Sequence, residues 1–393
     1  MDDFAQRGAL YEGREQTLVK HLILQKYLER FARIVGQGFE SITYVDCFSG
    51  PWNLKSDNFE DSSFAIALNE LRKARETLRK FGKNPQLRCF FIEKKKQSYT
   101  RLKAFADSTQ DAIIETKNSS LENSIADILT FVRDGGRRTF PFIFIDPTGW
   151  SGFAMKTIQP LLQLKPSEVL INFMTSHIQR FILSPLEESQ DSFKALFGSD
   201  AYREKLAGKE EQDRADTAVW FYMQSLKKAG DFKHVCCAMV LHPELDRTHF
   251  HLIYATRNDL GVDVFKDAEK KAMEAMEQAR AEAQQRKREQ RTGQTELFGS
   301  PVLHRANYYE SLRDRYLTRR MGFIRSLLEE KKRVSYDEVW AQALTAPMVW
   351  ESDIRQWLSD WVEQGLLSIQ GLGPRERVPK RESNVILVWR DTS

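Results

Sequence analysis

The chain has 393 residues, of which 41% are hydrophobic and 29% charged, and 59 basic side chains against 55 acidic ones give a net charge of +4. This composition is typical of a folded protein of two or three domains and is too weakly basic to indicate nucleic-acid binding by itself. The four cysteines form no CxxC pair, so we expect buried thiols and no metal site. The N-terminus has no signal-peptide pattern, and no apolar run approaches the roughly 20 residues that span a bilayer. We therefore expect a cytoplasmic protein that is not associated with membranes.

The first predicted element is a helix over residues 15–35, which has helical periodicity and is followed by Gly36 and Gly38, residues that often end helices. Seven strand-like runs follow, at 42–46, 87–93, 112–116, 141–146, 168–174, 234–241 and 249–255. The first five are short and almost continuously apolar, and helical stretches separate them, for example 62–81, 96–107, 120–133 and 154–163. This alternation predicts a parallel, Rossmann-like α/β sheet covered by helices on both sides.

The last two strands are separated only by "HPELDRT", which is too short for a crossover helix. We therefore expect an antiparallel connection, with six strands of one sense and one reversed strand at the edge of the sheet. Residues 175–233 form an insertion between the fifth and sixth strands and predict a helical cap.

The composition changes after the last strand. Residues 264–292 are rich in Ala, Glu, Gln, Lys and Arg, which predicts a long exposed helix or a partly ordered linker. Three short helices and two strands around the basic loop "LGPRERVPKRES" then follow the winged-helix pattern. We predict a methyltransferase-like α/β domain over 1–262, a charged helix and linker over 263–304, and a winged-helix domain over 305–393.

The carboxyl ends of the strands carry the chemistry, because ligands of parallel α/β sheets bind there. Gly50 lets the backbone approach a ligand closely, and Glu93 at the end of the second strand suits the hydroxyls of a ribose. Asp46 would repel a pyrophosphate but suits the cationic tail of S-adenosylmethionine. The alternative for each acid is that it only caps the following helix. The sequence contains no GxxxxGK[ST] loop, which argues against a nucleotide-dependent hydrolase.

The fourth strand ends in "IDPTGW", where Asp146 and Pro147 are the candidate catalytic residues. Pro147 donates no hydrogen bond, so the acceptors around it remain open to a substrate amino group, whose lone pair they would orient toward a methyl sulfonium. The alternative is a rigid turn. Asn118, after the third strand, is expected to reach the same edge and to contact the cofactor.

These motifs resemble those of the class I S-adenosylmethionine-dependent methyltransferases, and more closely those of the three-Cys-motif partner proteins (TcmP). The matching segments are "KHLILQKYL" (20–28), "YVDCFSGPW" (44–52), "DPTG" (146–149) and "FHLIYAT" (250–256). The likeness covers residues 15 to about 275, and 319–390 resembles the winged-helix domain attached to some members.

The resemblance implies a methyltransferase-like fold, S-adenosylmethionine as cofactor and a partner protein with a three-cysteine, radical-SAM-like signature, but no established substrate. It places the cofactor at Asp46, Phe48, Gly50 and Glu93, and both cofactor and substrate at Asp146. Pro51 and Trp52 continue the same loop, and Trp52 stands where the family has a glycine. Its ring either shapes an active cofactor pocket or closes one.

Two functions follow as hypotheses. The first is a methyltransferase acting on a nucleic acid or a nucleobase amine, with DNA or RNA phosphates contacted by the wing residues Arg375, Arg377, Lys380 and Arg381. The acidic helix "ESDIRQWLSDWVEQ" weakens the case for DNA, since it would be repelled from a groove. The second is a catalytically degenerate fold that serves as an adaptor or DNA-binding partner of a three-Cys-motif protein, in phage defence or a mobile element.

Polar residues near the strands have plainer interpretations. His249 and His251 alternate among apolar neighbours and are predicted to be sheet-face residues rather than metal ligands. His177 and Arg180 are predicted to cap a helix or to form a salt bridge. For Lys20 and His21 on the first helix, one hypothesis is that they reach the carboxylate of the cofactor.

Overall fold

The computed structural model describes residues 10–50, 54–56, 58–182, 184, 186–294, 307–373, 376 and 378–390. The chain divides into two compact units. The first comprises residues 1–235 and 239–304, and the second comprises residues 236–238 and 305–393.

The first unit is built on a seven-stranded sheet in the order β3-β2-β1-β4-β5-β7-β6. The strands are β1 (Ser41–Asp46), β2 (Gln86–Ile92), β3 (Ile113–Lys117), β4 (Thr139–Ile145), β5 (Glu168–Phe173), β6 (His234–Leu241) and β7 (Thr248–Thr256). The first five pair in parallel, and β7 runs antiparallel to β5. This confirms the predicted Rossmann-like, seven-stranded sheet of class I methyltransferase type.

One detail of the predicted sheet is wrong. The reversed strand was expected at the edge, but β7 lies between β5 and β6, and β6 occupies the edge. After β5, the chain passes through the helical insertion to β6 at the edge of the sheet. The short turn after β6 then brings the chain back, so that β7 lies between β5 and β6. The length of the turn alone predicts the reversal of β7 but not the side on which it inserts.

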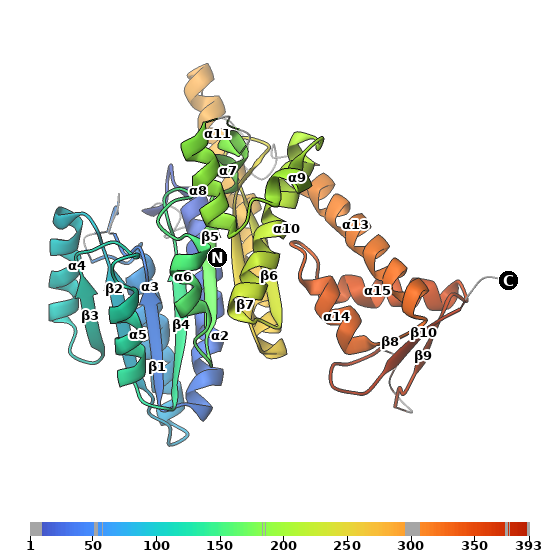
Figure 1. Cartoon of the computed structure of the whole chain (residues 1–393), viewed down its shortest axis with the longest axis horizontal. Coiled ribbons are helices and arrows are strands. Elements are labelled where there is room, and N and C mark those ends of the chain that lie inside the picture. The colour runs from blue at the N-terminus through green and yellow to red at the C-terminus, as the bar shows by residue number, and fades with distance from the viewer. Residues whose placement is uncertain are drawn as a thin grey trace. The chain divides into compact units, whose positions relative to one another are not determined.

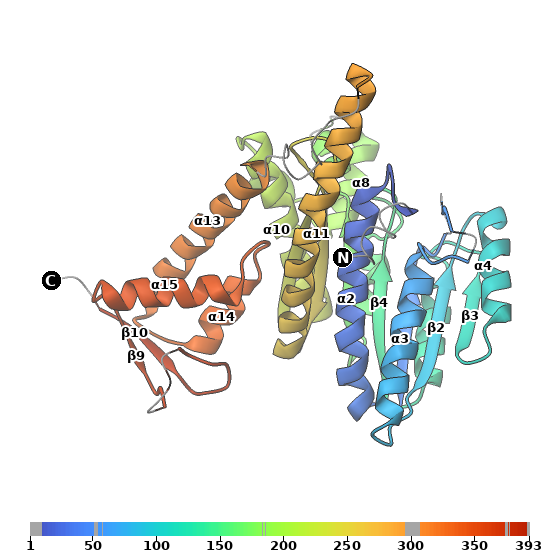
Figure 2. The ribbon, with the colours of Figure 1, turned by 180° about the vertical axis from the view of Figure 1, so that it is seen from behind.

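Two layers of helices cover the sheet, as Figures 1 and 2 show from opposite sides. One layer contains α3 (Ser63–Arg79), α2 (Glu15–Gly38) and α11 (Asp259–Thr292), and the other contains α5 (Ile125–Asp134), α6 (Met155–Leu162) and α10 (Glu211–Gly230). A further helix, α4 (Lys96–Ser108), packs beside β3. Every residue of β1 and β5 is buried, as continuous apolar runs between two helical layers require.

A buried polar network joins α2 to the sheet. The Tyr27 hydroxyl contacts the carboxylate of Glu168 and lies 2.7 Å from the Tyr254 hydroxyl, and Thr256 also donates to Glu168 at 2.9 Å. Burial raises the pKa of Glu168. Because Glu168 opens β5 whereas Tyr254 and Thr256 close β7, the network fixes α2 across two antiparallel strands.

The long helix α11 corrects a second prediction. It was expected to be exposed, or part of a linker, over 264–292, but it begins at Asp259 and packs along α2. Its buried face includes Ala268, Ala272, Met273, Met276 and Ala279. Alanine contributes little to an apolar pattern, yet its small side chain lets two helices approach closely, so the composition concealed a packed surface.

The insertion between β5 and β6 is helical, as predicted. It contains α7 (Thr175–Phe181), α8 (Glu187–Phe197), α9 (Tyr202–Leu206) and α10. Aromatic side chains form its core: the Phe197 ring stacks on Tyr202 at 4.9 Å, and Tyr222 contacts Phe173 of β5 at 4.7 Å. The insertion is therefore anchored at the carboxyl end of β5.

The second unit has three main helices and a three-stranded sheet. The helices are α13 (Asn307–Lys331), α14 (Tyr336–Leu344) and α15 (Glu351–Glu363), and the strands are β8 (Arg333–Ser335), β9 (Leu367–Gln370) and β10 (Ile386–Trp389). The order is β8-β10-β9 with antiparallel pairing. The three predicted helices and two predicted strands are present, and β8 is an additional strand whose three residues are too few for a sequence pattern.

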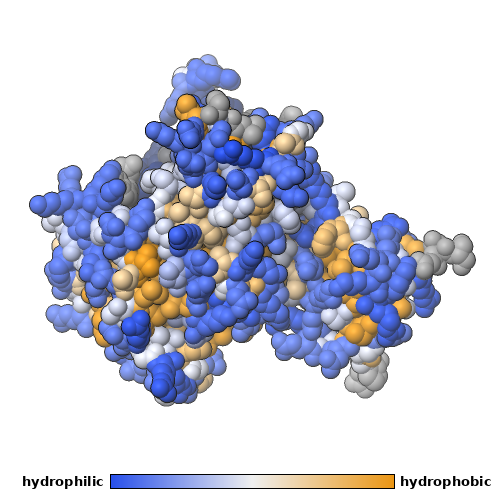
Figure 3. Space-filling view, in the orientation of Figure 1, coloured by the Kyte–Doolittle hydropathy of each residue, from blue (hydrophilic) through white to orange (hydrophobic). Residues whose placement is uncertain are grey.

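Hydrophilic residues cover most of the face presented in Figure 1, and apolar residues gather in smaller areas between them (Figure 3). No helix in the described part of the chain is long and apolar enough to cross a membrane. All four cysteines are buried, as predicted.

The α2–α11 contact can be tested with Ala272→Glu. Ala272 is 1% exposed, so the new carboxylate would be buried without a designed partner, and we expect the free energy of unfolding to fall by about 2–4 kcal/mol. Lys270→Glu places the same side chain on the exposed face of α11 and should cost less than about 0.5 kcal/mol. Urea unfolding measures both, and equal effects would show that this face is not packed.

Candidate functional site at the carboxyl ends of the strands

Four neighbouring strands bring the predicted acids to one edge. The order β2-β1-β4-β5 is parallel throughout, so Glu93 after β2, Asp46 at the end of β1 and Asp146 after β4 lie at adjacent strand ends. Asn172, the penultimate residue of β5, joins them. The edge predicted from sequence therefore exists, and it is distinctly acidic.

Asp46 is completely buried and is held by protein donors. Its Oδ1 accepts the backbone N–H of Phe48 at 3.1 Å, and Oδ2 accepts the hydroxyls of Ser63 at 2.6 Å and Tyr44 at 3.3 Å. Burial raises its pKa to about 6 and the charge of Asp146 adds to the rise, although the bonds from Ser63 and Phe48 oppose it. Asp46 thus ties the loop after β1 to Ser63 at the start of α3. It does not cap that helix in the predicted way, because the N-cap of α3 is Ser62, whose side chain accepts the backbone N–H of Ala65. Direct contact with a cofactor stays a prediction.

Asp146 lies between two partners that the sequence did not assign to it. Lys20 of α2 forms an ion pair with Oδ2, and Asn172 donates Nδ2–H to Oδ1 over 2.7 Å. The side chains of Lys20 and Asp146 keep 12% and 14% exposure, so the pair faces the edge and is not sealed in the core. A carboxylate has about four lone-pair positions, which leaves room for another donor such as a substrate amine.

Glu93 and Asn118 tie the neighbouring loops together. Glu93 is 4% exposed, and its Oε1 accepts the backbone N–H of Lys95 at 2.5 Å, just before α4. Asn118 donates from Nδ2 to the carbonyl oxygens of Glu93 at 2.8 Å and Lys94 at 3.0 Å. Both residues therefore have structural contacts at the edge, and their contacts with a nucleoside stay predictions.

The loop after β1 folds back over the end of β2. Ser49 donates its backbone N–H to the Ile92 carbonyl and its hydroxyl to the Asp46 carbonyl, both at 2.8 Å. Phe48 and Gly50 on either side are half-buried. Pro51 and Trp52, which were also predicted to contact the cofactor, lie outside the described residues.

The "DPTGW" loop is held by the helical insertion. Pro147 is buried. The ring of Trp150 stacks on Phe193 of α8 at 5.4 Å, and its Nε1–H donates to the Ser192 hydroxyl at 3.1 Å. Further along, Gly152 has φ +87° and lies beside the Phe48 ring, so a side chain there would be strained. The loops after β1 and β4 therefore meet.

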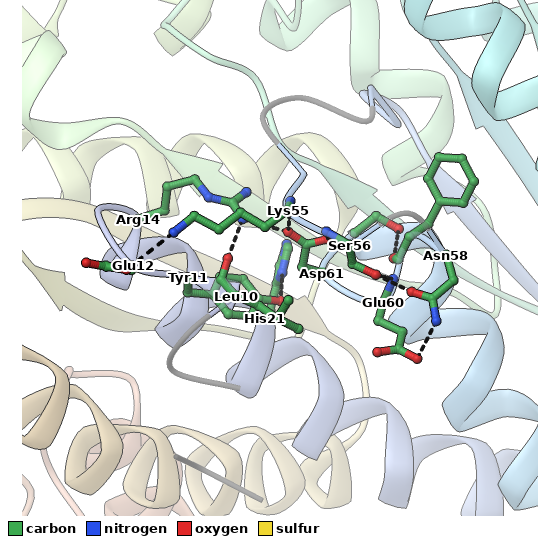
Figure 4. Close-up of polar contacts among 12 residues, drawn as sticks. Leu10, Tyr11, Glu12, Arg14, His21, Lys55, Ser56, Asn58, Glu60 and Asp61 are labelled. Carbon is green, nitrogen blue, oxygen red and sulfur yellow. Dashed lines mark hydrogen bonds and ion pairs between the residues drawn. The ribbon is translucent and has the colours of Figure 1, made fainter. Parts of the chain in front are cut away.

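A second polar cluster joins the segment before α2 to the loop before α3, as Figure 4 shows. Arg14 pairs with the buried Asp61 at 2.6 Å, and Asp61 also accepts the backbone N–H groups of Lys55 at 3.0 Å and Ser56 at 3.4 Å. Sequence reasoning missed Asp61, although an acid among "NFEDSS" is a common loop organiser.

His21 belongs to the same cluster, because its Nδ1 lies 2.8 Å from the Tyr11 hydroxyl. Burial lowers its pKa well below the usual range, with a further contribution from the charge of Lys20. A cavity of about 510 Å³ opens nearby and is lined by residues of α2 and α3, among them Gln25 and Glu70. His21 itself lines this cavity, whereas the strand-end residues Asp46, Gly50, Glu93 and Asp146 do not. Contact of His21 with a cofactor stays a prediction.

The histidines divide into two groups. His251 is buried on the sheet face, as predicted, and its Nδ1 bonds the Thr175 hydroxyl at 2.7 Å. His249 is only half-buried and reaches the edge, where His177 of α7 also lies. In the described part of the chain, no group of three or more His, Cys, Asp or Glu side chains could hold a metal ion.

Two of the predicted wing residues, Lys380 and Arg381, are described by the structure and have partners within the second unit. Lys380 pairs with Glu376 at 2.7 Å, and the guanidinium of Arg381 lies 5.0 Å from the centre of the Trp340 ring. The Lys380–Glu376 pair is exposed and contributes little to stability. The other two predicted nucleic-acid contacts, Arg375 and Arg377, fall outside the described residues.

The chain matches no family model and no curated protein sequence. Among solved structures it is similar to a Legionella pneumophila protein of family DUF519, with 10% identity, 65% of this chain and 91% of that chain covered, and a TM-score of 0.41. It is also similar to a plantazolicin methyltransferase in complex with SAH, with 9% identity, 65% of this chain and 90% of that chain covered, and a TM-score of 0.31. A loganic acid methyltransferase with SAH is similar at 8% identity, with 72% of this chain and 89% of that chain covered and a TM-score of 0.31. At such low identities and TM-scores, none of them identifies a substrate or a cofactor for this chain.

The raised pKa of Asp46 predicts a pH-dependent cost. The folded state favours the protonated form of Asp46. The contribution of this group to the free energy of unfolding is therefore fully present below pH 3.8 and is lost as pH rises through about 6. The loss amounts to about 3 kcal/mol from the size of the shift. Asp46→Asn should therefore gain stability relative to the unchanged protein between pH 4 and pH 7.5, since the amide keeps an acceptor for Phe48 without the charge. Denaturant unfolding of both proteins at the two pH values measures the gain. If the free energies of unfolding of the two proteins change with pH in the same way, burial of the Asp46 charge does not cost stability.

Proposed function

We propose that the chain is an S-adenosylmethionine-dependent methyltransferase that acts on an exocyclic amine of a nucleobase, free or in a nucleic acid. The observation that carries the proposal is the placement of Asp146 at the edge, oriented from both sides by Lys20 and Asn172 and still partly open to solvent. A carboxylate fixed in this way is suited to accept a hydrogen bond from a substrate amine.

The residues present fit this cofactor electrostatically. Asp46 and Asp146 act on each other strongly enough for Asp146 to contribute to the raised pKa of Asp46, and Lys20 offsets part of the negative charge. An edge with two aspartates favours a ligand that carries positive charge, and S-adenosylmethionine carries a sulfonium and an ammonium. We assign the nucleoside end to Glu93 and Asn118, and the methionine end to the loop of Phe48 and Gly50.

The chain's contribution to methyl transfer is orientation. When bound, S-adenosylmethionine supplies an electrophilic methyl group. Asp146 accepts an N–H bond from the acceptor amine and directs its lone pair, while Asn172 and Lys20 prevent the carboxylate from rotating. We therefore assign Asp146 to positioning and to stabilising the positive charge that develops on the amine.

The second candidate function is an adaptor of the three-Cys-motif partner type, in which the fold has lost catalysis. The observation that favours it is the complete enclosure of Asp46, whose oxygens are satisfied by Ser63, Tyr44 and Phe48. Isothermal titration with S-adenosylmethionine separates the two candidates. Saturable binding supports the enzyme, and a folded protein that shows no heat of binding supports the adaptor.

For the second unit we propose a winged-helix role in contacting nucleic acid through the loop between β9 and β10. The support is the exposed charge of Lys380 and the basic character of "RERVPKR". The acidic face of α15 is used within the unit, since Asp353 pairs with Arg313 at 2.8 Å and Glu351 pairs with Arg355 at 2.7 Å.

Asp146→Ala should lower the rate of methyl transfer to a nucleobase acceptor by about 100-fold or more, because the acceptor amine loses its orienting group. The fold should persist, since Asp146 is at the edge of the sheet. Tritium transfer from labelled S-adenosylmethionine measures the rate. Asp127→Ala, which removes an exposed acid on α5 that pairs with Lys117, is the matched control and should retain full activity. Unchanged turnover in Asp146→Ala would refute the assignment.

Combined charge reversal of Arg375, Arg377 and Lys380 should weaken nucleic-acid binding and flatten its salt dependence by about one unit of slope for each phosphate that is no longer neutralised. Fluorescence anisotropy with a labelled oligonucleotide at several salt concentrations measures both quantities. Arg355→Glu reverses a charge on α15 instead and should leave the slope unchanged. If the triple variant binds like the unchanged protein, the wing is not the contact surface.

A further inference from the structure

A group of basic side chains lies near Asp146, and only one of them, Lys20, has a task in the site described so far. It consists of Lys20, His177, His242 and His249 and is called the histidine corner below. In the pairing of β5 with β7, Phe173 lies opposite His251, so His249 lies beyond the end of β5, level with the start of α7. The packing of α7 against β7 brings His177 to the same place. His242 directly follows β6, and its ring centre lies 5.6 Å from that of His249.

Unsatisfied polar atoms surround the corner. The Nδ1 atom of His249, Oδ1 of Asn172 and Oγ of Ser176 are buried without a hydrogen-bond partner among the described residues. Each such atom loses its bonds to water without replacement, and folded proteins leave few of them. Asn172 is 3% exposed and already bonds Asp146, so the unsatisfied group begins directly beside the candidate catalytic residue.

The charged groups that act most strongly on His249 are basic, and they favour its neutral form. The groups that act on it electrostatically are His242, His177, Arg247 and Lys20, and together with burial, the largest cause, they lower its pKa to about 4. The nearby acids are compensated, because Lys20 pairs with Asp146. In the turn between β6 and β7, Glu244 pairs with Lys287 and Asp246 with Arg280.

The imidazoles can still donate hydrogen bonds in their neutral form. The Nδ1 atom of His242 accepts the backbone N–H groups of Glu244 at 3.1 Å and Leu245 at 3.2 Å, so its own proton sits on Nε2. The side chain of His177 forms no hydrogen bond with the other described residues. The two pairs with Lys287 and Arg280 on α11 hold the turn, and thereby His242, in place.

We propose that the histidine corner binds the phosphate group of the nucleotide whose base is presented to Asp146. The inference rests on the proposed function for the identity of the acceptor, while the hydrogen-bond donors of the corner stand on their own. Phosphate is the chemistry that this set recognises, because it accepts hydrogen bonds from several donors at once. A free nucleotide and a nucleic-acid strand offer the same group.

The test is a titration of the full chain, with isotopically labelled histidine, by inorganic phosphate, followed through the imidazole resonances. We expect the signals of His177, His242 and His249 to shift together with one dissociation constant. His234 lies at the opposite end of β6, paired with Asp259 at 2.5 Å, and serves as the internal control that should not shift. Equal shifts at all four histidines, or none at saturating phosphate, would overturn the proposal.

Two variants sharpen the result. His249→Gln and His177→Gln should each weaken phosphate binding by about tenfold, the size expected for one charge-assisted hydrogen bond. The half-buried His177 can be replaced with little risk to folding, and the His234 signal reports the fold of both variants. Lys233→Gln removes a cation at the far end of β6 and should leave the affinity unchanged. Phosphate affinity that is unaltered in both histidine variants contradicts the assignment.

Comparison of adenosine monophosphate with a short single-stranded oligonucleotide, each competing with phosphate, identifies the source of the group. The ligand that competes at the lower concentration is the form that the corner binds. If neither ligand competes with phosphate, the corner does not bind the phosphate of a nucleotide. Titration with S-adenosylmethionine remains a separate measurement. If the cofactor binds but phosphate shifts no histidine signals, only the proposal for the histidine corner is refuted. If phosphate shifts the signals but the cofactor does not bind, only the proposed methyltransferase function is refuted.

Discussion

The contact between Lys20 and Asp146 is the interaction on which the candidate site depends. Two aspartates lie at the ends of neighbouring strands, and the charge of Asp146 acts on the buried Asp46. Like charges so placed require either a cation or a proton. Lys20 supplies the cation to Asp146, whereas Asp46 is left to be enclosed by hydroxyls and a backbone N–H. One acid is consequently open to a ligand and the other is part of the framework.

The same contact explains why helices far from the edge matter. Lys20 is carried by α2, which is fixed across β5 and β7 by the network around Glu168 and along its length by α11. The helix α11 in turn holds the turn that follows β6 through Arg280. The orientation of Asp146 and the position of His242 therefore depend on one layer of helices.

Much of this arrangement could be predicted from the sequence. Apolar runs locate the strands to within one or two residues, and parallel strands bring their ends to one edge, which is why Asp46, Glu93 and Asp146 could be named. The partners of Asp146 could not, because Lys20 is 126 positions away and such pairing is set by tertiary packing. Asn172 left a signal, as a lone amide inside the otherwise apolar run "VLINFM". The position of β7 and the buried face of α11 depend on long-range contacts that periodicity does not encode.

The enclosure of Asp46 has a consequence for how a ligand would be sensed. A carboxyl group whose pKa is about 6 is partly protonated in a neutral solution, and a cation arriving nearby would drive that proton off. Uptake of the ligand and release of a proton then become one event, and its heat depends on the ionisation enthalpy of the buffer. The edge would therefore select ligands by their charge without any contact to Asp46. Its affinity for cations would fall as the solution becomes more acidic.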